Sequence, residues 1–305
     1  MPMSGFTASP CDLPGDPLIP PPPADLSHIK NKRLDLRYAR QSEAQSIDLY
    51  FPDDYTGRLP LVIYIHGGAF MICDKRDIQL LPYLEVLKHG YALAAVNYRM
   101  SGEAIFPAAV HDCKCVVRWL RAHADEYNLD SDRFAAAGGS AGGNLSALLA
   151  ASAGVAELED PSQGYADYSA AVQAAVDWYG PTDFTRMDAQ LAELGLGPCT
   201  HNNDDSPESR YMGRKITELD HAYVNKANPM IYIKKDLPPI FIQHGSMDNI
   251  VPILQSKEFV KAIENLLGPG RVRFEILEGA GHADPAFETP ENITKVIDFL
   301  DTYLK

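Results

Sequence analysis

Apolar and polar positions follow two alternating periods along most of the chain. Short runs in which every residue is apolar are typical of strands buried on both faces of a parallel sheet. Between them lie stretches in which apolar residues recur every three or four positions, which is the period of an amphipathic helix. This alternation predicts an α/β fold with a mainly parallel sheet covered by helices on both faces. The predicted strands are 33–39, 46–51, 61–66, 91–97, 133–138, 172–178, 239–243 and 271–277, of which the first two form a hairpin.

Proline and glycine mark the ends of the predicted helices. A proline in the first turn and a glycine just past the end are the usual limits of an α-helix. One helix begins with Pro107, and another begins at Pro252 and ends at 268–270. The last begins at 289–290, and a fourth, at 144–153, follows a glycine-rich turn.

Two segments depart from this alternation. Residues 1–28 hold eight of the 23 prolines within their first 23 positions, which predicts an irregular arm, because proline disfavours both helix and sheet. Residues 186–235 are polar and contain no convincing strand, and a stretch of this length between two core strands is usually functional. We therefore expect one domain over residues 29–305, with the 186–235 insertion folded as a small cap over the site.

A candidate nucleophile lies between a predicted strand and a predicted helix. Residues 138–142 match the pattern G-x-S-x-G, with Ser140 at its centre. A sharp strand-to-helix turn at this pattern raises a serine hydroxyl above the sheet. The alternative, a glycine-rich phosphate loop, is disfavoured because the segment contains neither G-x-G-x-x-G nor G-K-[ST].

The sequence His66-Gly67-Gly68-Ala69-Phe70 follows another buried strand. Acyl transfer develops a negative oxygen in its transition state, and backbone N–H groups must already point at it. We expect the amides of Gly67 and Gly68, together with that of Ala141, to form this oxyanion hole. We expect His66 to brace the loop.

A base and an acid that orients it should lie on loops after later strands. Asp248 follows the strand 239–243, and His282 follows the last strand. The order along the chain is therefore Ser, Asp, His, which is the order that accompanies a G-x-S-x-G turn of this kind. His244 stands at a strand end and is expected to be structural. Asp177 and Asp183 precede the insertion, and hydrogen bonding within their loop is the favoured interpretation.

Composition and charge exclude several other function classes. The formal net charge of −14 and the pI of about 5.0 argue against a nucleic-acid partner and against anionic membranes. The five cysteines show no zinc-site spacing, so we expect free thiols and no metal. The first eleven residues lack the basic start and apolar core of a signal peptide, which favours a cytoplasmic protein.

The motifs resemble those of the hormone-sensitive-lipase-like esterases. More closely, three segments resemble the bifunctional acetylxylan esterase and feruloyl esterase family of carbohydrate-degrading bacteria. The resemblance covers about residues 33–305 and implies an α/β-hydrolase fold with an eight-stranded sheet, no cofactor, and acetyl or feruloyl esters of plant polysaccharide as substrates. Ala69 stands where many hormone-sensitive-lipase-like enzymes have a third glycine, which favours the acetylxylan and feruloyl esterases over the lipases. The three segments are 97–109, 177–184 and 279–287.

These expectations define a serine carboxylic-ester hydrolase for short acyl esters, with a small-molecule ester or an acylated oligosaccharide as its substrate. Phe70, Trp178 and Tyr179 are the candidate substrate contacts, because aromatic rings stack on sugars and on feruloyl groups. Two alternatives stay open. One is an aryl formamidase of the same fold, and the other is an inactive hydrolase-like receptor for a small ligand.

Overall fold

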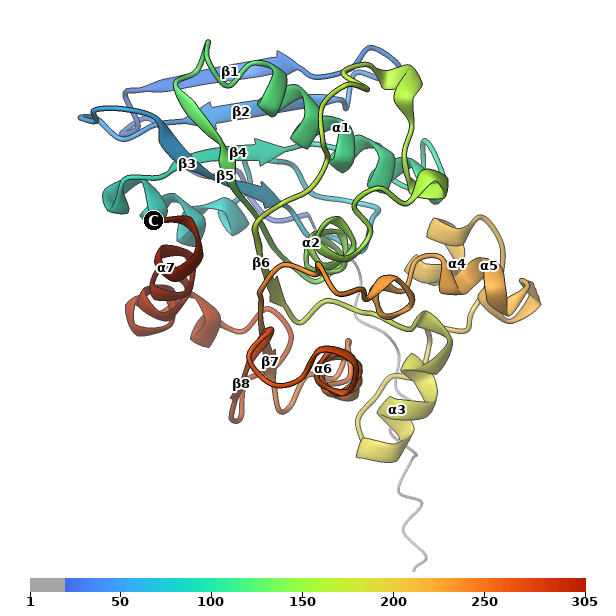
Figure 1. Ribbon diagram of the computed structural model, residues 1–305. Helices are drawn as coiled ribbons and strands as arrows, with labels where there is room; N and C mark the ends of the chain where they lie inside the picture. Colours follow the sequence, from blue (N-terminus) through green and yellow to red (C-terminus); the bar gives the residue numbers. More distant parts are fainter. Residues whose placement is uncertain (1–19) are drawn as a thin grey trace, which may run out of the picture.

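One eight-stranded sheet organises the chain. The computed structural model describes residues 20–305, so most of the predicted 1–28 arm lies outside the described part. The strand order is β1-β2-β4-β3-β5-β6-β7-β8, as Figure 1 shows. The pairs β1–β2 and β2–β4 are antiparallel, and all other pairs are parallel. The strands are β1 (Lys32–Arg37), β2 (Ser46–Tyr50), β3 (Leu59–Ile65), β4 (Ala92–Val96), β5 (Leu129–Gly139), β6 (Ala174–Trp178), β7 (Ile240–Gly245) and β8 (Val272–Leu277).

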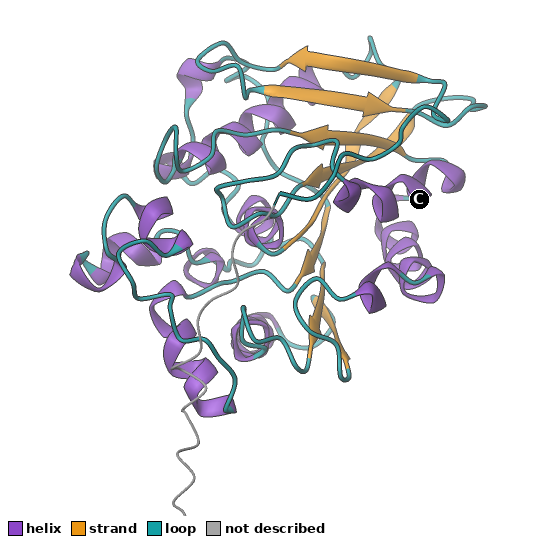
Figure 2. Cartoon of the chain, turned by 180° about the vertical axis from the view of Figure 1, so that it is seen from behind, coloured by secondary structure: helices purple, strands orange, loops and turns teal. Residues whose placement is uncertain are grey.

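Helices cover both faces of the sheet, as Figures 1 and 2 show. Five long helical elements border the core: the 3-10 helix η2 (Ile78–His89), α1 (Ala108–Ala122), α2 (Ala141–Ala151), α6 (Leu254–Leu267) and α7 (Pro290–Leu304). The shorter helices are η3 (Ala156–Leu158), η4 (Pro161–Gln163), η5 (Phe184–Arg186), α3 (Met187–Leu194), α4 (Pro207–Met212), η6 (Ile216–Glu218), α5 (His221–Asn225), η7 (Pro229–Tyr232) and η8 (Pro285–Glu288).

Strand β3 shows how the core is divided between the two faces. Successive side chains of a strand point to opposite sides. Leu61, Ile63 and Ile65 therefore join the core that packs under α1, α2 and α6. Val62 and Tyr64 join the second core, under η2 and α7. Because both faces are covered, every residue of β3 is buried, which explains its continuous apolar pattern.

The predicted α/β fold with its parallel sheet is confirmed, and all eight predicted strands are present. Observed strand ends differ from the prediction by a few residues, most at β5, which begins at Leu129. Helix η2 is the one long element that the periodicity did not predict. It is a 3-10 helix that contains Pro82, so its apolar residues do not repeat with the 3.6-residue period of an α-helix.

The insertion between β6 and β7 consists of short helices, and residues 186–235 contain no strand. The described part of the N-terminal arm lies against the loop before η2, where Pro23 forms an isolated bridge with Asp77. None of the helices formed by residues 20–305 combines the length and the apolar character needed to span a membrane.

The cysteines depart in part from the expectation of free thiols. Cys73, Cys113 and Cys115 are free. Cys199 is disulfide-bonded, which corrects that expectation for this residue. Spacing along the chain does not reveal such a bond, because residues far apart in sequence can meet once the chain is folded.

Candidate active site

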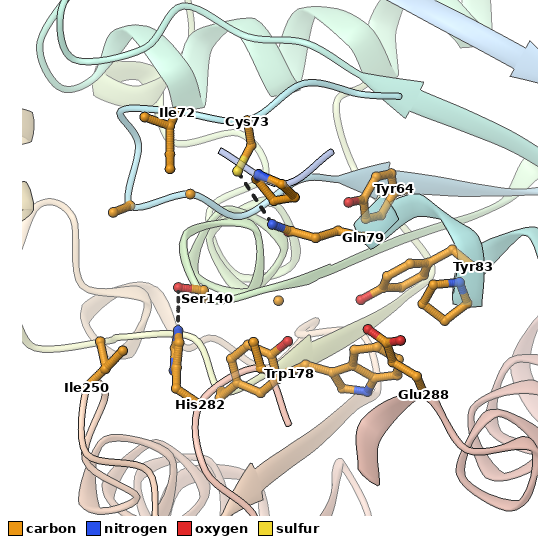
Figure 3. Close-up of a pocket in the computed structure, with 17 residues that line it drawn as sticks. Tyr64, Ile72, Cys73, Gln79, Tyr83, Ser140, Trp178, Ile250, His282 and Glu288 are labelled. Atoms are coloured by element: carbon orange, nitrogen blue, oxygen red, sulfur yellow. Dashed lines mark hydrogen bonds between the residues drawn. The ribbon is translucent and has the colours of Figure 1, made fainter. Parts of the chain in front are cut away.

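Ser140 stands at the turn between β5 and α2, with φ 57° and ψ −123°. A positive φ is unfavourable for serine, so the surrounding structure must hold it. The close approach of α2 to β3 does so, and it requires a glycine at position 142. A Cβ on Gly142 would lie 2.0 Å from the carbonyl oxygen of Ile65. The turn presents the Ser140 hydroxyl to a pocket, which Figure 3 shows.

A chain of two hydrogen bonds links this hydroxyl to a buried carboxylate. Ser140 Oγ lies 3.0 Å from His282 Nε2, and His282 Nδ1 lies 2.8 Å from Asp248 Oδ2. Both distances are those of ordinary hydrogen bonds. The three side chains come from the ends of β5, β8 and β7, so the parallel sheet brings together all three residues that the sequence singled out.

Asp248 is held as an ionised acceptor. Its Oδ1 accepts the backbone N–H groups of Ile250 and Val251, each at 2.9 Å. Burial alone would raise the pKa of Asp248, but His282 and His244 outweigh it and hold that pKa below its usual range. His244, expected to be structural, is buried and places Nε2 3.3 Å from Asp248 Oδ2. The sequence did not predict this second histidine contact with the acid.

One backbone N–H in the loop after β3 and one in the turn at Ser140 are the candidates for the oxyanion hole. Gly68 has φ 90°, and a Cβ there would lie 2.3 Å from the carbonyl oxygen of Ile72, so only glycine fits. Within residues 20–305 the N–H groups of Gly68 and Ala141 have no hydrogen-bond acceptor. Gly67 differs from the expectation, because its N–H donates to Gln79 Oε1 at 3.2 Å. That amide is therefore engaged by the Gln79 side chain.

His66 braces this loop, as expected. Its ring stacks on Tyr98 with the ring centroids 4.5 Å apart, and its Nδ1–H donates to the carbonyl of Gly67 at 2.9 Å. The Tyr98 hydroxyl in turn donates to the His66 carbonyl at 3.0 Å. These contacts fix the backbone from which Gly68 projects.

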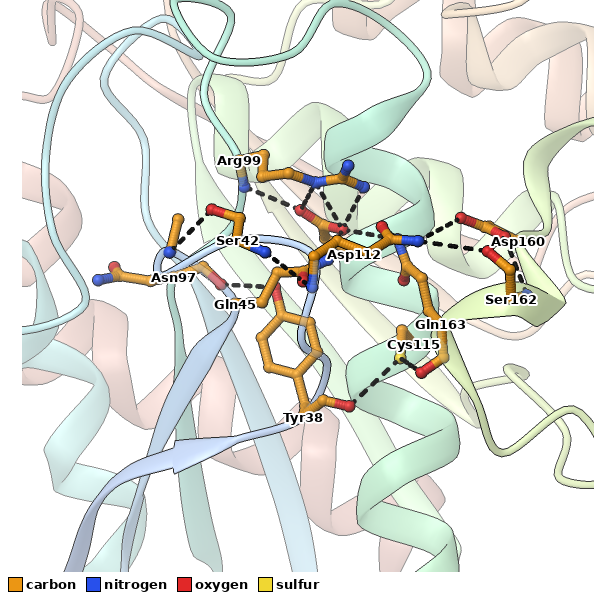
Figure 4. Close-up of polar contacts among 12 residues, drawn as sticks. Tyr38, Ser42, Gln45, Asn97, Arg99, Asp112, Cys115, Asp160, Ser162 and Gln163 are labelled. Carbon is orange, nitrogen blue, oxygen red and sulfur yellow. Dashed lines mark hydrogen bonds and ion pairs between the residues drawn. The ribbon is translucent and has the colours of Figure 1, made fainter.

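A buried polar network anchors the segment that carries Tyr98, as Figure 4 shows. Arg99 binds Asp112 through two side-chain nitrogens, with Nη2 2.7 Å from Oδ1 and Nε 2.9 Å from Oδ2. Gln45 and Gln163 each donate to Asp112 Oδ1 at 2.8 Å. The network joins β4, α1 and the opening hairpin, so its effect on the site is through the scaffold.

The pocket beside Ser140 has a volume of about 280 Å³ and also borders on His282. Trp178 and Tyr179, two of the three predicted substrate contacts, line it. The Tyr179 ring packs edge-on against the imidazole of His282, with the centroids 4.8 Å apart. These two aromatic residues therefore shape the wall next to the base.

Phe70, the third predicted contact, does not line this pocket. It is 2% exposed and stacks on Tyr211, with the ring centroids 3.9 Å apart. Tyr211 belongs to α4 of the insertion, so Phe70 ties the loop after β3 to that insertion. Phe70 follows the glycine loop in the sequence, but this position did not reveal that its side chain turns into the core.

The structure adds lining residues that the sequence analysis missed. Gln79 and Tyr83 come from η2, Tyr64 from β3, and Glu288 from η8. Pro21 of the N-terminal arm also lines the pocket. None of these five residues belongs to a recognisable motif. Tyr64 lies between Ile63 and Ile65 on β3, and neighbouring side chains of a strand point to opposite faces of the sheet. This alternation was the one sequence signal that Tyr64 faces η2.

The 186–235 insertion contributes no residue to the lining of this pocket. It lies beside the site and contacts its supports. His201 Nε2–H donates to the carbonyl of Ile250 at 2.9 Å, and the N–H of the same residue is one of the two amides that hold Asp248. The insertion therefore forms no wall of this pocket, and its role as a cap over the site stays a prediction.

The remaining acidic candidates serve their own loop. Asp177 Oδ1 accepts the N–H of Gly180 at 2.9 Å, and Asp183 Oδ1 accepts the N–H of Thr185 at 3.0 Å. Burial raises the pKa of Asp177 to about 6. Across residues 20–305, no three histidine, cysteine or acidic side chains converge as they would around a metal ion.

Comparison with known proteins places the chain in a family. The sequence model of the BD-FAE family matches residues 47–263. A probable carboxylic ester hydrolase, LipM of Mycobacterium tuberculosis, is 33% identical over 237 residues, which are 76% of this chain and 52% of LipM. The chain thus spans about half the length of such mycobacterial relatives. Kynurenine formamidase avaC of Aspergillus versicolor is 28% identical over 76% of this chain and 85% of its own length.

Two solved structures share the whole fold. A truncated carbohydrate esterase from gut microbiota superimposes with a TM-score of 0.80 at 29% identity, over 92% of this chain and 99% of its own. A bifunctional GH43-CE protein of Bacteroides eggerthii gives a TM-score of 0.80 at 30% identity, over 90% of this chain and 35% of its own. The family match covers most of the chain, with Ser140 and Asp248, so the chain belongs to the BD-FAE family and has the α/β-hydrolase fold of these esterases.

Proposed function

We propose that the protein is a serine carboxylic-ester hydrolase, with Ser140 as nucleophile, His282 as general base and Asp248 as the orienting acid. The observation that carries this proposal is the chain of hydrogen bonds from Ser140 Oγ through His282 to Asp248, at 3.0 and 2.8 Å, at the edge of a pocket. A nucleophile within hydrogen-bond reach of a base that a third group orients is the arrangement that activates serine.

The reaction would proceed in two halves. Ser140 Oγ attacks the ester carbonyl while its proton moves to His282 Nε2, and the amides of Gly68 and Ala141 bind the oxyanion. The protonated imidazole gives that proton to the departing alcohol, which leaves an acyl group on Ser140. Water then attacks the acyl-enzyme with His282 again as base, and the acid and the free serine are released. Asp248 stays ionised throughout and stabilises the imidazolium.

The proposed substrates are short acyl esters, acetyl and feruloyl esters of plant carbohydrate among them. Two similar structures are a carbohydrate esterase and a bifunctional GH43-CE protein, which supports a carbohydrate-linked ester. The aromatic walls of the pocket, Trp178 and Tyr179, suit a flat ring. Tyr83 helps to close the pocket, whose volume of about 280 Å³ suits a small acyl group better than a long alkyl chain.

Covalent labelling and a substituted serine test the nucleophile. Ser140→Ala should remain folded and lose ester hydrolysis by roughly a thousandfold or more. A fluorophosphonate probe should label the wild type on Ser140 alone. Ser152→Ala is the matched control, because Ser152 follows the same helix and its hydroxyl only donates to the Leu148 carbonyl. Failure of the probe to label Ser140 would favour the inactive-receptor alternative.

A substrate panel tests the specificity. We expect kcat/KM for p-nitrophenyl acetate to exceed that for the butyrate and, more strongly, for the decanoate. Methyl ferulate and acetylated xylo-oligosaccharides test the carbohydrate-linked esters. An aryl formamide belongs in the panel, because the sequence of the kynurenine formamidase avaC aligns with this chain over 85% of its own length. A formamide turned over faster than every ester would replace the esterase proposal by an amidohydrolase with the same triad.

A further inference from the structure

A second imidazole lies beside Asp248, and the proposed reaction does not use it. His244 Nε2 is 3.3 Å from Asp248 Oδ2, the same oxygen that accepts the Nδ1–H of His282. The side chains of His244 and Asp248 are both 0% exposed. Because water does not screen this contact, the imidazole acts directly on the charge of the carboxylate.

The neighbours of His244 decide which of its ring nitrogens carries a hydrogen. Nε2 lies 2.8 Å from the carbonyl oxygen of Val251 and 3.3 Å from the carboxylate of Asp248. A carbonyl and an ionised carboxylate only accept hydrogen bonds, so a hydrogen must stand on Nε2. It donates to the Val251 carbonyl and turns its partial positive charge toward the acid. Nδ1 lies 2.7 Å from Ser256 Oγ, whose hydroxyl can donate to it.

Val251 links His244 to the acid a second time. Its backbone N–H donates to Asp248 Oδ1 at 2.9 Å, while its carbonyl accepts the Nε2–H of His244. His244 itself belongs to β7, which pairs with β6 on one side and with β8 on the other. The imidazole therefore ties the loop that holds Asp248 to the interior of the sheet.

Asp248 needs this support because it must stay charged while it is buried. Burial raises the pKa of Asp248, and the contacts with His282 and His244 together hold that pKa below its usual range. In the proposed reaction His282 becomes an imidazolium, which Asp248 stabilises only while its oxygen stays beside Nδ1. Whatever fixes the Asp248 carboxylate therefore also fixes the general base.

We propose that His244 is a positioning residue for the reaction: the hydrogen on its Nε2 holds the loop 248–251 and keeps the Asp248 carboxylate in line with His282. The inference rests on the proposed esterase function and adds a residue that acts through the acid. It differs from a packing role, because it assigns the effect to one hydrogen on one ring nitrogen.

Two substitutions of His244 replace different ring nitrogens. The amide of asparagine ends near the place of Nδ1, whereas the longer side chain of glutamine can bring an N–H to the place of Nε2. His244→Asn should lower kcat for p-nitrophenyl acetate about tenfold to a hundredfold, because a misplacement of about 1 Å can cost about a hundredfold. KM should be unchanged, because His244 does not line the pocket. His244→Gln should restore most of the lost kcat.

His123→Asn is the matched control. His123 is also a packed imidazole with one ring nitrogen on a backbone carbonyl, since it stacks on Trp119 and its Nδ1 lies 2.8 Å from the Trp119 carbonyl oxygen. It lies outside the pocket lining, so kcat should equal that of the wild type whatever the change in Tm. The rate at which a fluorophosphonate probe labels Ser140 gives the same comparison without any choice of substrate.

NMR of the wild-type protein with isotope-labelled histidine tests the proposal without a substitution. We expect the hydrogen of His244 on Nε2, in the hydrogen-bonded position that its neighbours require. In His244→Asn, the low-field proton signal of the His282 Nδ1–H should weaken or shift, because the carboxylate that accepts it is no longer fixed. The wild-type measurement does not depend on whether a variant folds.

Three results would overturn the positioning role. One is a wild-type His244 that carries a hydrogen on Nδ1 alone. Another is a wild-type kcat in His244→Asn, and the third is a loss that His244→Gln shares in full together with a lower Tm, which would mean that only the shape of the ring matters. If the wild type hydrolyses no ester and the probe does not label Ser140, the esterase proposal itself fails. The hydrogen on His244 is measured separately, so the two failures are distinguishable.

Discussion

The two sides of the pocket differ in how their polar groups find partners. On the reaction side, Asp248 accepts two backbone amides and His282, His244 Nε2 lies 3.3 Å from its carboxylate, and His282 is bonded at both ring nitrogens. On the opposite side, the hydroxyls of Tyr64 and Tyr83 have no partner within residues 20–305. A satisfied network holds fixed geometry, whereas an unsatisfied buried polar group only costs stability. The comparison separates the residues proposed to react from those that line the opposite wall.

The largest effect should come from breaking the satisfied side. Asp248→Asn keeps the shape of the acid but removes its charge and presents an amide to His282 in place of an acceptor. By analogy with the serine-protease triad, the wrong imidazole tautomer should lower kcat by about 10⁴. The check is kcat for p-nitrophenyl acetate, with circular dichroism to confirm folding.

Asp183→Asn is the control for that substitution. Asp183 also accepts a backbone amide at a helix start, but it lies outside the pocket lining. Its kcat should remain within a factor of two or so of the wild type, because surface caps affect stability more than chemistry. A loss as large as that of Asp248→Asn would mean that the charge acts through folding.

The loop that presents the oxyanion amide should be the next most sensitive element. In Gly68→Ala the new Cβ would meet the Ile72 carbonyl oxygen at 2.3 Å, at a φ of 90°. The loop must shift, and loss of one oxyanion donor lowers kcat by about 10² to 10³. The measurement is kcat against KM, because a donor to the transition state changes kcat first.

Gly154→Ala controls for backbone strain alone. Gly154 has φ 76°, but a Cβ there meets nothing within 4 Å. The substitution should destabilise the fold by about 1 kcal/mol and leave kcat unchanged. Equal kcat losses in both variants would show that strain, and not the placement of the Gly68 amide, decides activity.

The support of the acid should depend on pH. Burial would lower the pKa of His201, but Glu208, whose carboxylate lies 3.0 Å away, raises that pKa to about 9. Since the folded pKa exceeds the unfolded value of 6.5, the ion pair stabilises the fold fully below about pH 6.5, and this stabilisation is lost as pH rises through 9. Its size is about 3 kcal/mol.

Urea unfolding at pH 6, 7.5 and 9.5 measures this dependence. His201→Gln and Glu208→Gln should each flatten the decline in the free energy of unfolding between pH 6 and 9.5. Because His201 bonds to the Ile250 carbonyl beside the Asp248 loop, the variants should also lower kcat several-fold. A wild-type stability that rises over this interval would contradict the assignment of the charge to His201.

The same comparison explains what the sequence predicted and what it did not. Ser140, Asp248 and His282 lie in short motifs at strand ends, where chain order and the parallel sheet dictate where each side chain goes. The hydrogen bond from the Gly67 amide to Gln79 was not predicted, because Gln79 comes from η2, an element whose irregular pattern left no periodic signal. A glycine loop alone does not reveal which of its amides is already engaged.

The pocket wall opposite Ser140 could not be predicted for a related reason. Tyr64 and Tyr83 are apolar in pattern and read as core, and the absence of a hydrogen-bond partner emerges only when all neighbours are placed. Phe70 gave the opposite error: an aromatic residue beside the oxyanion loop looked like a substrate contact, yet it stacks on Tyr211. The residues proposed to react lie in short motifs that can be recognised in the sequence. The residues of the pocket wall come from elements far apart in the sequence and belong to no motif.

The smallest predicted effect concerns Pro21, which brings the N-terminal arm to the pocket. Its neighbours hold it in place, since the carbonyl of Pro22 accepts the N–H of Ile78 at 3.0 Å and the N–H of Ala24 donates to Arg76 at 2.7 Å. Pro21→Ala removes ring methylenes from the lining while these backbone bonds remain. At about 0.8 kcal/mol per fully buried methylene, the partly buried ring contributes about 1 kcal/mol, or a factor of about five in kcat/KM.

That loss should appear in KM for methyl ferulate, whose ring we expect in the pocket, and be absent for p-nitrophenyl acetate, whose acyl group is much smaller. Pro22→Ala, an exposed neighbour outside the lining, is the matched control and should change neither substrate. An equal loss on both esters would indicate that Pro21 supports the reacting residues. The arm would then act through Ser140, His282 and Asp248, and not through direct contact with the substrate.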